Sequence, residues 1–227
     1  MSKYRGDSPA KVVARSWAYD QIPEKDLFSK NHIIIASEHG GDIDELQGRG
    51  VRNERILACD LNHNAVILAY ARGVDAVYCS IQQRVRDTLL DRVPATLSSV
   101  NIDLCNILPT SVEVLNECLR LLHKAHWDGI VMLTFAVGYK DDLACNGVLC
   151  SECKNGPCDT KRLDYLNDNV YRTNKKARCE TNQHLPFRKS NLYRYQSNTA
   201  VCDGSPMGLV VMRVSNGNIV CINKPTT

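Results

Sequence analysis

The sequence lacks long apolar runs. No segment reaches the roughly 18 consecutive apolar residues that a membrane-spanning helix requires. The first residues, MSKYRGDSPAKVV, contain no apolar core of a secretory signal. Aromatic residues are few, at 6%, and a net charge of +3 is too small to indicate a polyanionic partner by itself. We therefore expect a cytoplasmic protein with no membrane-embedded segment.

Two nucleotide-binding signatures are also missing. No G-x-x-x-x-G-K-[ST] loop occurs, which excludes a P-loop nucleotidase. The turn after the first expected strand has two adjacent glycines, Gly40 and Gly41, in place of the G-x-G-x-x-G that cradles a pyrophosphate. A nicotinamide or flavin site is therefore disfavoured.

Apolar segments alternate with amphipathic ones along the first 137 residues. The periodicities predict strands at 32–36, 55–59, 74–78, 99–105 and 129–137 and helices at 8–20, 42–49, 62–72, 81–93 and 110–126. In the first helix, Val12, Val13, Ser16 and Trp17 share one face. Alternating strands and helices indicate one α/β domain with a mostly parallel sheet and right-handed crossovers.

Polar residues follow four expected strands where each strand ends, at 36–42, 60–62, 79–81 and 103–106. Ligands of open parallel sheets bind beyond these carboxyl ends. Asp60 follows the glycine turn by about 20 residues, a spacing at which a carboxylate accepts hydrogen bonds from a ribose. Each position also has a structural interpretation: Asp60 as a helix cap, the glycines as a plain turn, Asp103 as a satisfied buried acid. The joint pattern favours a nucleoside-containing ligand.

The glycine turn is acidic. Glu38 and Asp42 flank the two glycines, and carboxylates at these positions would repel phosphates. An acidic turn suits a ligand that has a cationic centre and an amino group. S-adenosylmethionine has both, so it is the cofactor that we expect here.

These segments carry a family resemblance. The succession IIIASEHGGDI, ILACDLNHNAV, AVYCSI and VNIDLCN resembles the first four motifs of class I S-adenosylmethionine-dependent methyltransferases. Expected strands at 191–197 and 207–214 are similar to the antiparallel hairpin that closes the family's sheet. The resemblance covers about residues 30–138 and 190–214 and implies a Rossmann-like, mostly parallel seven-stranded α/β sheet with a C-terminal antiparallel hairpin. We expect a single domain over residues 1–227, with a Cys-rich basic insertion at 139–190. The glycine turn departs from the family's usual acid followed by G-x-G.

The resemblance also implies a role for each strand end. The glycine turn would enclose the methionine part of the cofactor, Asp60 would accept both ribose hydroxyls, and Leu61 would pack on the adenine. The cofactor-binding residues expected in this way are Ala36, Ser37, Glu38, Gly40, Gly41, Asp42, Asp60, Leu61, Asn62, Ser80, Ile81 and Asp103.

The fourth motif, Asp103-Leu104-Cys105-Asn106, would face the methyl group and the acceptor. It lacks the [DNS]-P-P-[YFW] pattern of enzymes that methylate amino groups of DNA bases, which disfavours that reaction. Cys105 ends an apolar strand with no base beside it in sequence, so we favour buried packing over a nucleophile. Asp103 and Asn106 are the expected catalytic residues, orienting the acceptor without a covalent intermediate.

The eleven cysteines are unevenly distributed, and four of them fall within 14 residues: Cys145, Cys150, Cys153 and Cys158. Four thiolates suffice for a tetrahedral structural Zn²⁺ site. The odd total without a secretion signal argues against a disulfide framework. A reduced loop without metal and an iron–sulfur cluster stay open as alternatives, and downstream Cys179 or His184 can replace a ligand.

The segment between residues 161 and 194 holds nine basic residues against three acids, with tyrosines and a phenylalanine interleaved. Cations that neutralise phosphates and aromatics that stack on bases are the ingredients of RNA or DNA binding. A solvated loop with ordinary tyrosine packing is the alternative. Two functions follow: a methyltransferase whose zinc-stapled basic insertion holds the acceptor, or a non-catalytic protein of the same fold that binds nucleic acid or a protein.

Overall fold

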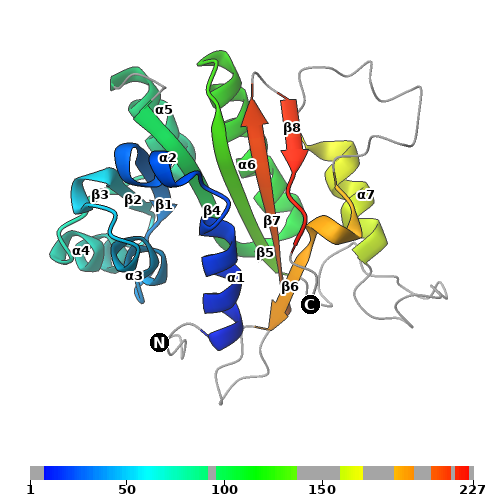
Figure 1. Cartoon of the computed structure of the whole chain (residues 1–227), viewed down its shortest axis with the longest axis horizontal. Coiled ribbons are helices and arrows are strands. Elements are labelled where there is room, and N and C mark those ends of the chain that lie inside the picture. The colour runs from blue at the N-terminus through cyan, green and yellow to red at the C-terminus, as the bar shows by residue number, and fades with distance from the viewer. Residues whose placement is uncertain are drawn as a thin grey trace.

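An eight-stranded mixed sheet forms the centre of the molecule, with strand order β3-β2-β1-β4-β5-β7-β6 and β8 paired to β7 (Figure 1). The computed structural model describes residues 8–91, 96–136, 159–170, 187–196, 206–215 and 218–224. The strands are β1 (Asn31–Ile35), β2 (Ile56–Asp60), β3 (Asp75–Tyr78), β4 (Leu97–Ile107), β5 (Gly129–Ala136), β6 (Tyr193–Gln196), β7 (Pro206–Ser215) and β8 (Asn218–Cys221).

The first five strands are parallel. β1 pairs with β2 on one side and with β4 on the other, so the strand order reverses at β1. β7 then runs antiparallel between β5 and β6. The Rossmann-like architecture expected from the sequence, a mostly parallel sheet closed by a C-terminal antiparallel hairpin, is therefore confirmed.

Helices cover both faces of the sheet (Figure 1). One face carries α1 (Pro9–Tyr19), α2 (Glu24–Ser29), α3 (Gly41–Gly48) and α4 (His63–Ala71). The other carries α5 (Ile81–Asp91), α6 (Leu108–Lys124) and α7 (Asp159–Asn169). The central strand β5 is covered on both faces, and its side chains from Ile130 to Phe135 are all buried. This double burial explains why its sequence reads as a continuous apolar run.

The start of α1 follows its sequence signals, but its buried face is not the one that carries Val12 and Val13. Ser8 caps the helix by accepting a hydrogen bond from the Lys11 amide at 3.1 Å, and Pro9 occupies the first helical position. The side chains of Val12 and Val13 are 43% and 56% exposed. The helix instead buries small and polar residues, Ala14, Arg15, Ala18 and Tyr19.

Three short elements were not predicted. α2 spans six residues, β8 spans four, and α7 lies within the insertion at 139–190. Each is too short or too polar to give a clear period. Within the described ranges, no helix has the length and hydropathy that crossing a bilayer requires.

A histidine is fully buried in β1 and has a defined tautomer. The Nε2 atom of His32 lies 2.9 Å from the Leu27 carbonyl oxygen, which can only accept a hydrogen bond, so Nε2 carries the proton. Nδ1 therefore accepts from the Ser99 hydroxyl at 2.8 Å. Burial lowers the pKa of His32 to about 4, although the Leu27 carbonyl and Asp26 oppose the shift.

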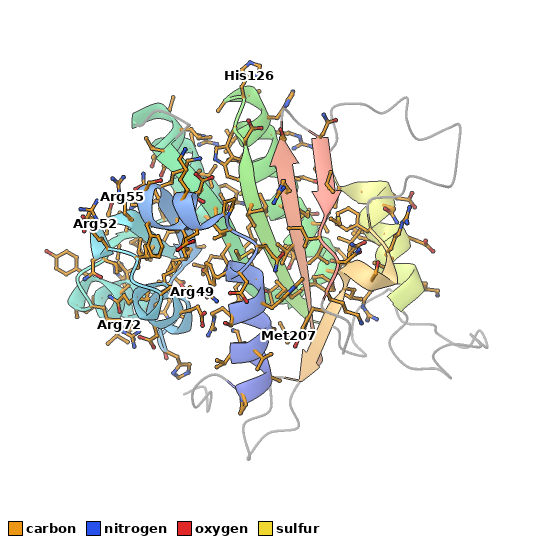
Figure 2. The ribbon with its side chains drawn as sticks, in the orientation of Figure 1. Arg49, Arg52, Arg55, Arg72, His126 and Met207 are labelled. Atoms are coloured by element: carbon orange, nitrogen blue, oxygen red, sulfur yellow. The ribbon has the colours of Figure 1, made fainter. Side chains whose placement is uncertain are left out.

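This histidine should make the fold less stable in mild acid. Below about pH 6.5 the unfolded chain binds a proton at His32, while the folded protein stays neutral there down to about pH 4. Urea unfolding should therefore show that the free energy of unfolding of the wild type falls as the pH is lowered from about 6.5 to about 4. This fall should exceed that of His32→Gln by up to about 3 kcal/mol. His126→Asn, at an exposed site far from β1, should keep the wild-type dependence (Figure 2). Equal dependence in His32→Gln and the wild type would contradict the assignment.

Candidate functional site

The turn after β1 is built around a left-handed glycine. Gly40 has φ +64°, a conformation that residues with a Cβ rarely adopt, and α3 begins at the next residue. The Gly40 amide donates to the Ser37 carbonyl and to its hydroxyl, both at 3.0 Å. The backbone therefore reverses tightly at the carboxyl end of β1, at the switch point where ligands of such sheets bind.

Arg72, at the end of α4, is hydrogen-bonded to this turn (Figure 2). Its guanidinium donates to the carbonyl oxygens of His39 and Gly40, each at 3.0 Å, and to the Asp44 carboxylate at 2.7 Å. A Cβ added to Gly40 would collide with the guanidinium. The requirement for glycine at this position thus comes from the backbone conformation and from Arg72, with no ligand needed to explain it.

Two carboxylates stand together at the ends of β1 and β2. Asp60 accepts from the Asn62 amide at 2.8 Å, and the Asn62 side chain donates to Glu38 at 3.0 Å. Burial raises the pKa of Asp60, and Glu38 raises it further, while the amides of Asn62 and Leu61 oppose the rise. Neither acid forms an ion pair with a described side chain, so this end of the sheet is negative.

A second pair of acids lies deeper, under α1. Asp42 Oδ1 is within 3.1 Å of both the Tyr19 hydroxyl and Arg15 Nε, and Asn101 Nδ2 donates to it at 2.9 Å. Burial raises the pKa of Asp42, and the Asp103 carboxylate adds to the rise, although Arg15 and Lys11 oppose it. Desolvation therefore raises the pKa of Asp42 by more than its contacts with Arg15, Lys11 and Tyr19 lower it.

Asp103 belongs to the same pocket and pairs with Lys11 at 2.9 Å. The pocket is lined by residues of α1, α3, β4, β5 and β7: Lys11, Ala14, Arg15, Ala18, Asp42, Asn101, Asp103, Met132, Thr134 and Leu209. The positive charges of Lys11 and Arg15 balance the two carboxylates of the pocket, Asp42 and Asp103. Asn101 Oδ1 is buried and has no hydrogen-bond partner among the described groups.

The structure brings most of the predicted cofactor residues to one edge of the sheet. Strand pairing places Asp60 beside Tyr78, so Ser80 and Ile81 follow at the same edge. Pairing of Ile34 with Asn101 brings Asp103 level with Ala36. The Leu61 side chain is 65% exposed, so it packs little on the rest of the protein.

Two predicted positions have local structural roles. Asn62 caps α4 through Asn64, and the Ser80 hydroxyl accepts from the Gln83 amide at 3.2 Å at the start of α5. Asn106 lies in β4, but the position of its side chain is outside what the structure describes. The residues that sequence reasoning missed are Lys11, Arg15, Tyr19, Arg72 and Asn101. The spacing of Lys11, Arg15 and Tyr19 by four residues, one helical face, was the available signal.

The predicted zinc ligands Cys145, Cys150, Cys153 and Cys158 lie outside the described residues. Among the residues that are described, no group of three or more metal-binding side chains occurs. Part of the basic segment is structural: Arg162 in α7 is fully buried, Phe187 is 2% exposed, and Tyr193 stacks on Trp17 with ring centroids 5.4 Å apart. These side chains are occupied by packing within the protein.

The Arg72 contact predicts a non-additive pair of substitutions. Gly40→Ala should destabilise the protein by about 1–3 kcal/mol, because of its left-handed backbone and the collision with Arg72. In an Arg72→Ala background the collision is gone, so the cost of Gly40→Ala should fall by about 0.5–3 kcal/mol. Urea unfolding followed by circular dichroism measures all four proteins.

Gly48→Ala is the matched control, because a Cβ there meets no atom within 4 Å and the residue is helical. It should leave stability unchanged or raise it by up to about 1 kcal/mol. The same cost of Gly40→Ala with and without Arg72 would show that the two residues do not interact.

The chain matches no protein-family model and no curated protein in sequence. Among solved structures, it is similar to a geranyl diphosphate methyltransferase in complex with S-adenosylmethionine, at 11% identity and a TM-score of 0.44 over 94% of this chain and 86% of that one. It is also similar to S-adenosylmethionine-dependent methyltransferases from Archaeoglobus fulgidus and Aquifex aeolicus. The former has 10% identity and a TM-score of 0.41 over 88% and 93% of the two chains. The latter has 10% identity and a TM-score of 0.39 over 90% and 93%.

Identities near 10% and TM-scores below 0.5 do not determine a substrate or an activity. The strand pairing itself supplies the architecture: five parallel strands, a reversal of order at β1, and an antiparallel strand inserted between β5 and β6. The chain has a Rossmann-like α/β fold whose sheet ends in a C-terminal antiparallel hairpin.

Proposed function

We propose that this protein is an S-adenosylmethionine-dependent methyltransferase that binds its cofactor across the carboxyl ends of β1, β2 and β3. The observation that carries the proposal is the position of Asp60. It lies at the tip of β2, half-buried, beside the turn at the switch point, with Oδ1 held by the Asn62 amide. A carboxylate held in this way is suited to accept hydrogen bonds from both hydroxyls of a ribose.

The electrostatics support a cationic ligand. Glu38 and Asp60 leave the strand ends negative, whereas a pyrophosphate would be repelled there. An amino group and a sulfonium centre would be attracted. The exposed side chain of Leu61 supplies an apolar surface for an adenine ring, with Ser80 and Ile81 on the neighbouring strand end.

The acceptor side would be at the end of β4. Bound at this edge, the cofactor supplies an electrophilic methyl group. Asp103, held by Lys11, would orient the acceptor and stabilise the positive charge that develops on it, with Asn106 three residues further along the strand. Arg15 fixes Asp42 in the same pocket, so the acids there are held in place before any substrate arrives.

Nucleic acid is the acceptor class that we propose, held by the insertion at 139–190. Its support is the sequence: a basic, tyrosine-containing segment that follows four closely spaced cysteines. Zn²⁺ bound by those cysteines would cross-link the segment that contains them. Lys161 and Arg188 are exposed, whereas Arg162 is buried.

A non-catalytic protein of the same fold is the second candidate. It is favoured by the charge pairing under α1, where Lys11 and Arg15 already neutralise both acids of the pocket. It is also favoured by Arg72, which accounts for the glycine turn without a ligand. Such a protein would use the insertion to bind nucleic acid or another protein.

Calorimetric titration separates these functions. S-adenosylmethionine and S-adenosylhomocysteine should both bind the wild type, and Asp60→Asn should weaken each about 10- to 100-fold, the effect of losing a charged hydrogen-bond acceptor. Glu54→Gln is the matched control, an exposed carboxylate that pairs with Arg52 on the surface, and should bind as the wild type does.

No heat with either ligand would refute the cofactor proposal, and undiminished binding by Asp60→Asn would refute this location for it. Binding without methyl transfer to RNA, DNA or protein would favour the non-catalytic function.

The insertion makes a linked prediction about metal and nucleic acid. Elemental analysis of protein purified without chelator should find close to one zinc per chain. The same preparation should bind a single-stranded oligonucleotide with an affinity that falls steeply with salt, by a log–log slope of about −2 for three phosphate contacts. Chelation should weaken this binding. A metal-free protein, or binding insensitive to salt, would contradict the respective part of the proposal.

A further inference from the structure

Large apolar side chains gather on the surface at the β3 edge of the sheet. There α4 and β3 pack side by side at one end of the molecule (Figure 1). The exposed apolar side chains of these two elements form what we call the α4–β3 patch: Ile67, Leu68, Tyr70, Val77 and Tyr78. The other large apolar side chains that are exposed in the described ranges are spread over α1, α2, the end of β2, α5 and β8.

The apolar residues of α4 are distributed in the reverse of the usual order for a surface helix. Its sequence, HNAVILAYA, contains no charged residue, and the residues that it buries are two alanines, Ala65 and Ala69. The larger Ile67 and Tyr70 are 62% and 72% exposed. A helix that is apolar on all sides is normally buried on all sides. The outward face of α4 therefore has the composition of a contact surface.

β3 leaves the adjoining edge of the sheet open. Within the described residues it pairs with β2 alone, in a regular parallel register. Soluble proteins usually protect such an edge with a lysine, a proline or a bulge, and Asp75-Ala76-Val77-Tyr78 has none of these. Tyr78 stacks on His63 of α4, with ring centroids 4.0 Å apart and planes 7° from parallel. The patch is therefore continuous from the helix to the strand.

The α4–β3 patch has nearly the size of one side of a dimer interface. Its two tyrosines, Tyr70 and Tyr78, are 72% and 50% exposed, and an aromatic side chain can bury about 150–250 Å². With the three aliphatic side chains, the exposed apolar area is on the order of 400 Å². A standard interface takes about 800 Å² from each partner, of which roughly 65% is apolar in homodimers. The patch therefore supplies most of the apolar area that one subunit of such a dimer contributes.

The charges beside the patch have opposite signs at its two ends. Glu38 and Asp60 lie together at the carboxyl ends of β1 and β2. Arg52 and Arg55 precede β2, at the amino end of the strands, where Glu54 offsets one of the two charges (Figure 2). A two-fold axis through the middle of the patch reverses one copy relative to the other, so the acidic end of each faces the basic end of its partner. Charges at the rim of an interface in this way set its orientation.

We propose that the α4–β3 patch is the contact surface of a homodimer, in which α4 of one copy packs antiparallel to α4 of the second copy about a two-fold axis. Ile67 is the middle residue of α4 (His63–Ala71), so it lies nearest the axis and meets the same residue of the second copy. The absence of charge on α4 suits this contact, because any charge near the axis would face its own copy. The dimer goes beyond the proposed function and requires neither cofactor binding nor catalysis.

Analytical ultracentrifugation of the full-length protein, with reductant and without cofactor, tests the dimer. The wild type should sediment as a species of twice the 25.4 kDa chain mass, with a Kd on the order of 1 µM or below. Ile67→Glu places two carboxylates near the axis and should raise this Kd about 100-fold or more, the effect of like charges brought together in an interface. Val220→Glu is the matched control, since Val220 is also 62% exposed but lies in β8, beyond β7, and should leave the Kd unchanged.

A charge pair at position 67 tests the two-fold axis. Ile67→Lys alone should be monomeric, as Ile67→Glu is. An equimolar mixture of the two variants should form a heterodimer, because opposite charges then meet at the axis, and this recovery would also show that both variants are folded. A wild type that stays monomeric up to about 100 µM would overturn the proposal. A dimer left intact by Ile67→Glu would overturn it too, as would a mixture that forms no heterodimer.

Discussion

The carboxylate of Asp42 joins three parts of the chain that are far apart in sequence. It lies at the start of α3 and receives Tyr19 and Arg15 from α1 and Asn101 from β4. Moving a carboxylate out of water costs several kcal/mol, and only a set of donors in good geometry offsets that cost. The position of α1 over the sheet is therefore set by this polar cluster, and the pocket exists because α1 stands there. Removing either α1 partner would leave the buried carboxylate with one donor fewer, which should destabilise the fold.

The polar contacts of Asp42 also explain why the buried face of α1 could not be predicted from the sequence. The strands and long helices were predictable because burial imposes a period: β5 is apolar throughout, and α6 buries Val112, Leu115, Leu119 and Leu122 at helical spacing. The orientation of α1 was not, since its inward face carries Arg15 and Tyr19 while Val12 and Val13 point outward. A hydrophobic period identifies a face only when the partner surface is apolar. Here the partner is an acid from α3 and an amide from β4, and neither can be recognised from α1 itself.

The glycine turn shows the same limit at a single residue. A sequence indicates that Gly40 needs freedom of φ or a close approach, but not which group approaches. The group proves to be the guanidinium of Arg72, which follows the turn by 32 residues and binds two of its carbonyl oxygens. The predicted positions at the strand ends, by contrast, did come together, because parallel pairing brings all carboxyl ends to one edge whatever the side chains are.

The four acids of this region divide into two pairs that differ in their partners, and this difference bears on the proposed binding surface. Asp42 and Asp103 are matched by Arg15 and Lys11, so that pocket offers a ligand little net charge. Glu38 and Asp60 are bridged by Asn62, whose side-chain amide donates to Glu38 and whose backbone amide donates to Asp60. Burial raises the pKa of Asp60, and repulsion from the Glu38 carboxylate adds to the rise. A cation bound between them would relieve the repulsion as well as gain its own attraction. The mouth of the site at β1 and β2, rather than the pocket under α1, is therefore where the structure favours positive charge.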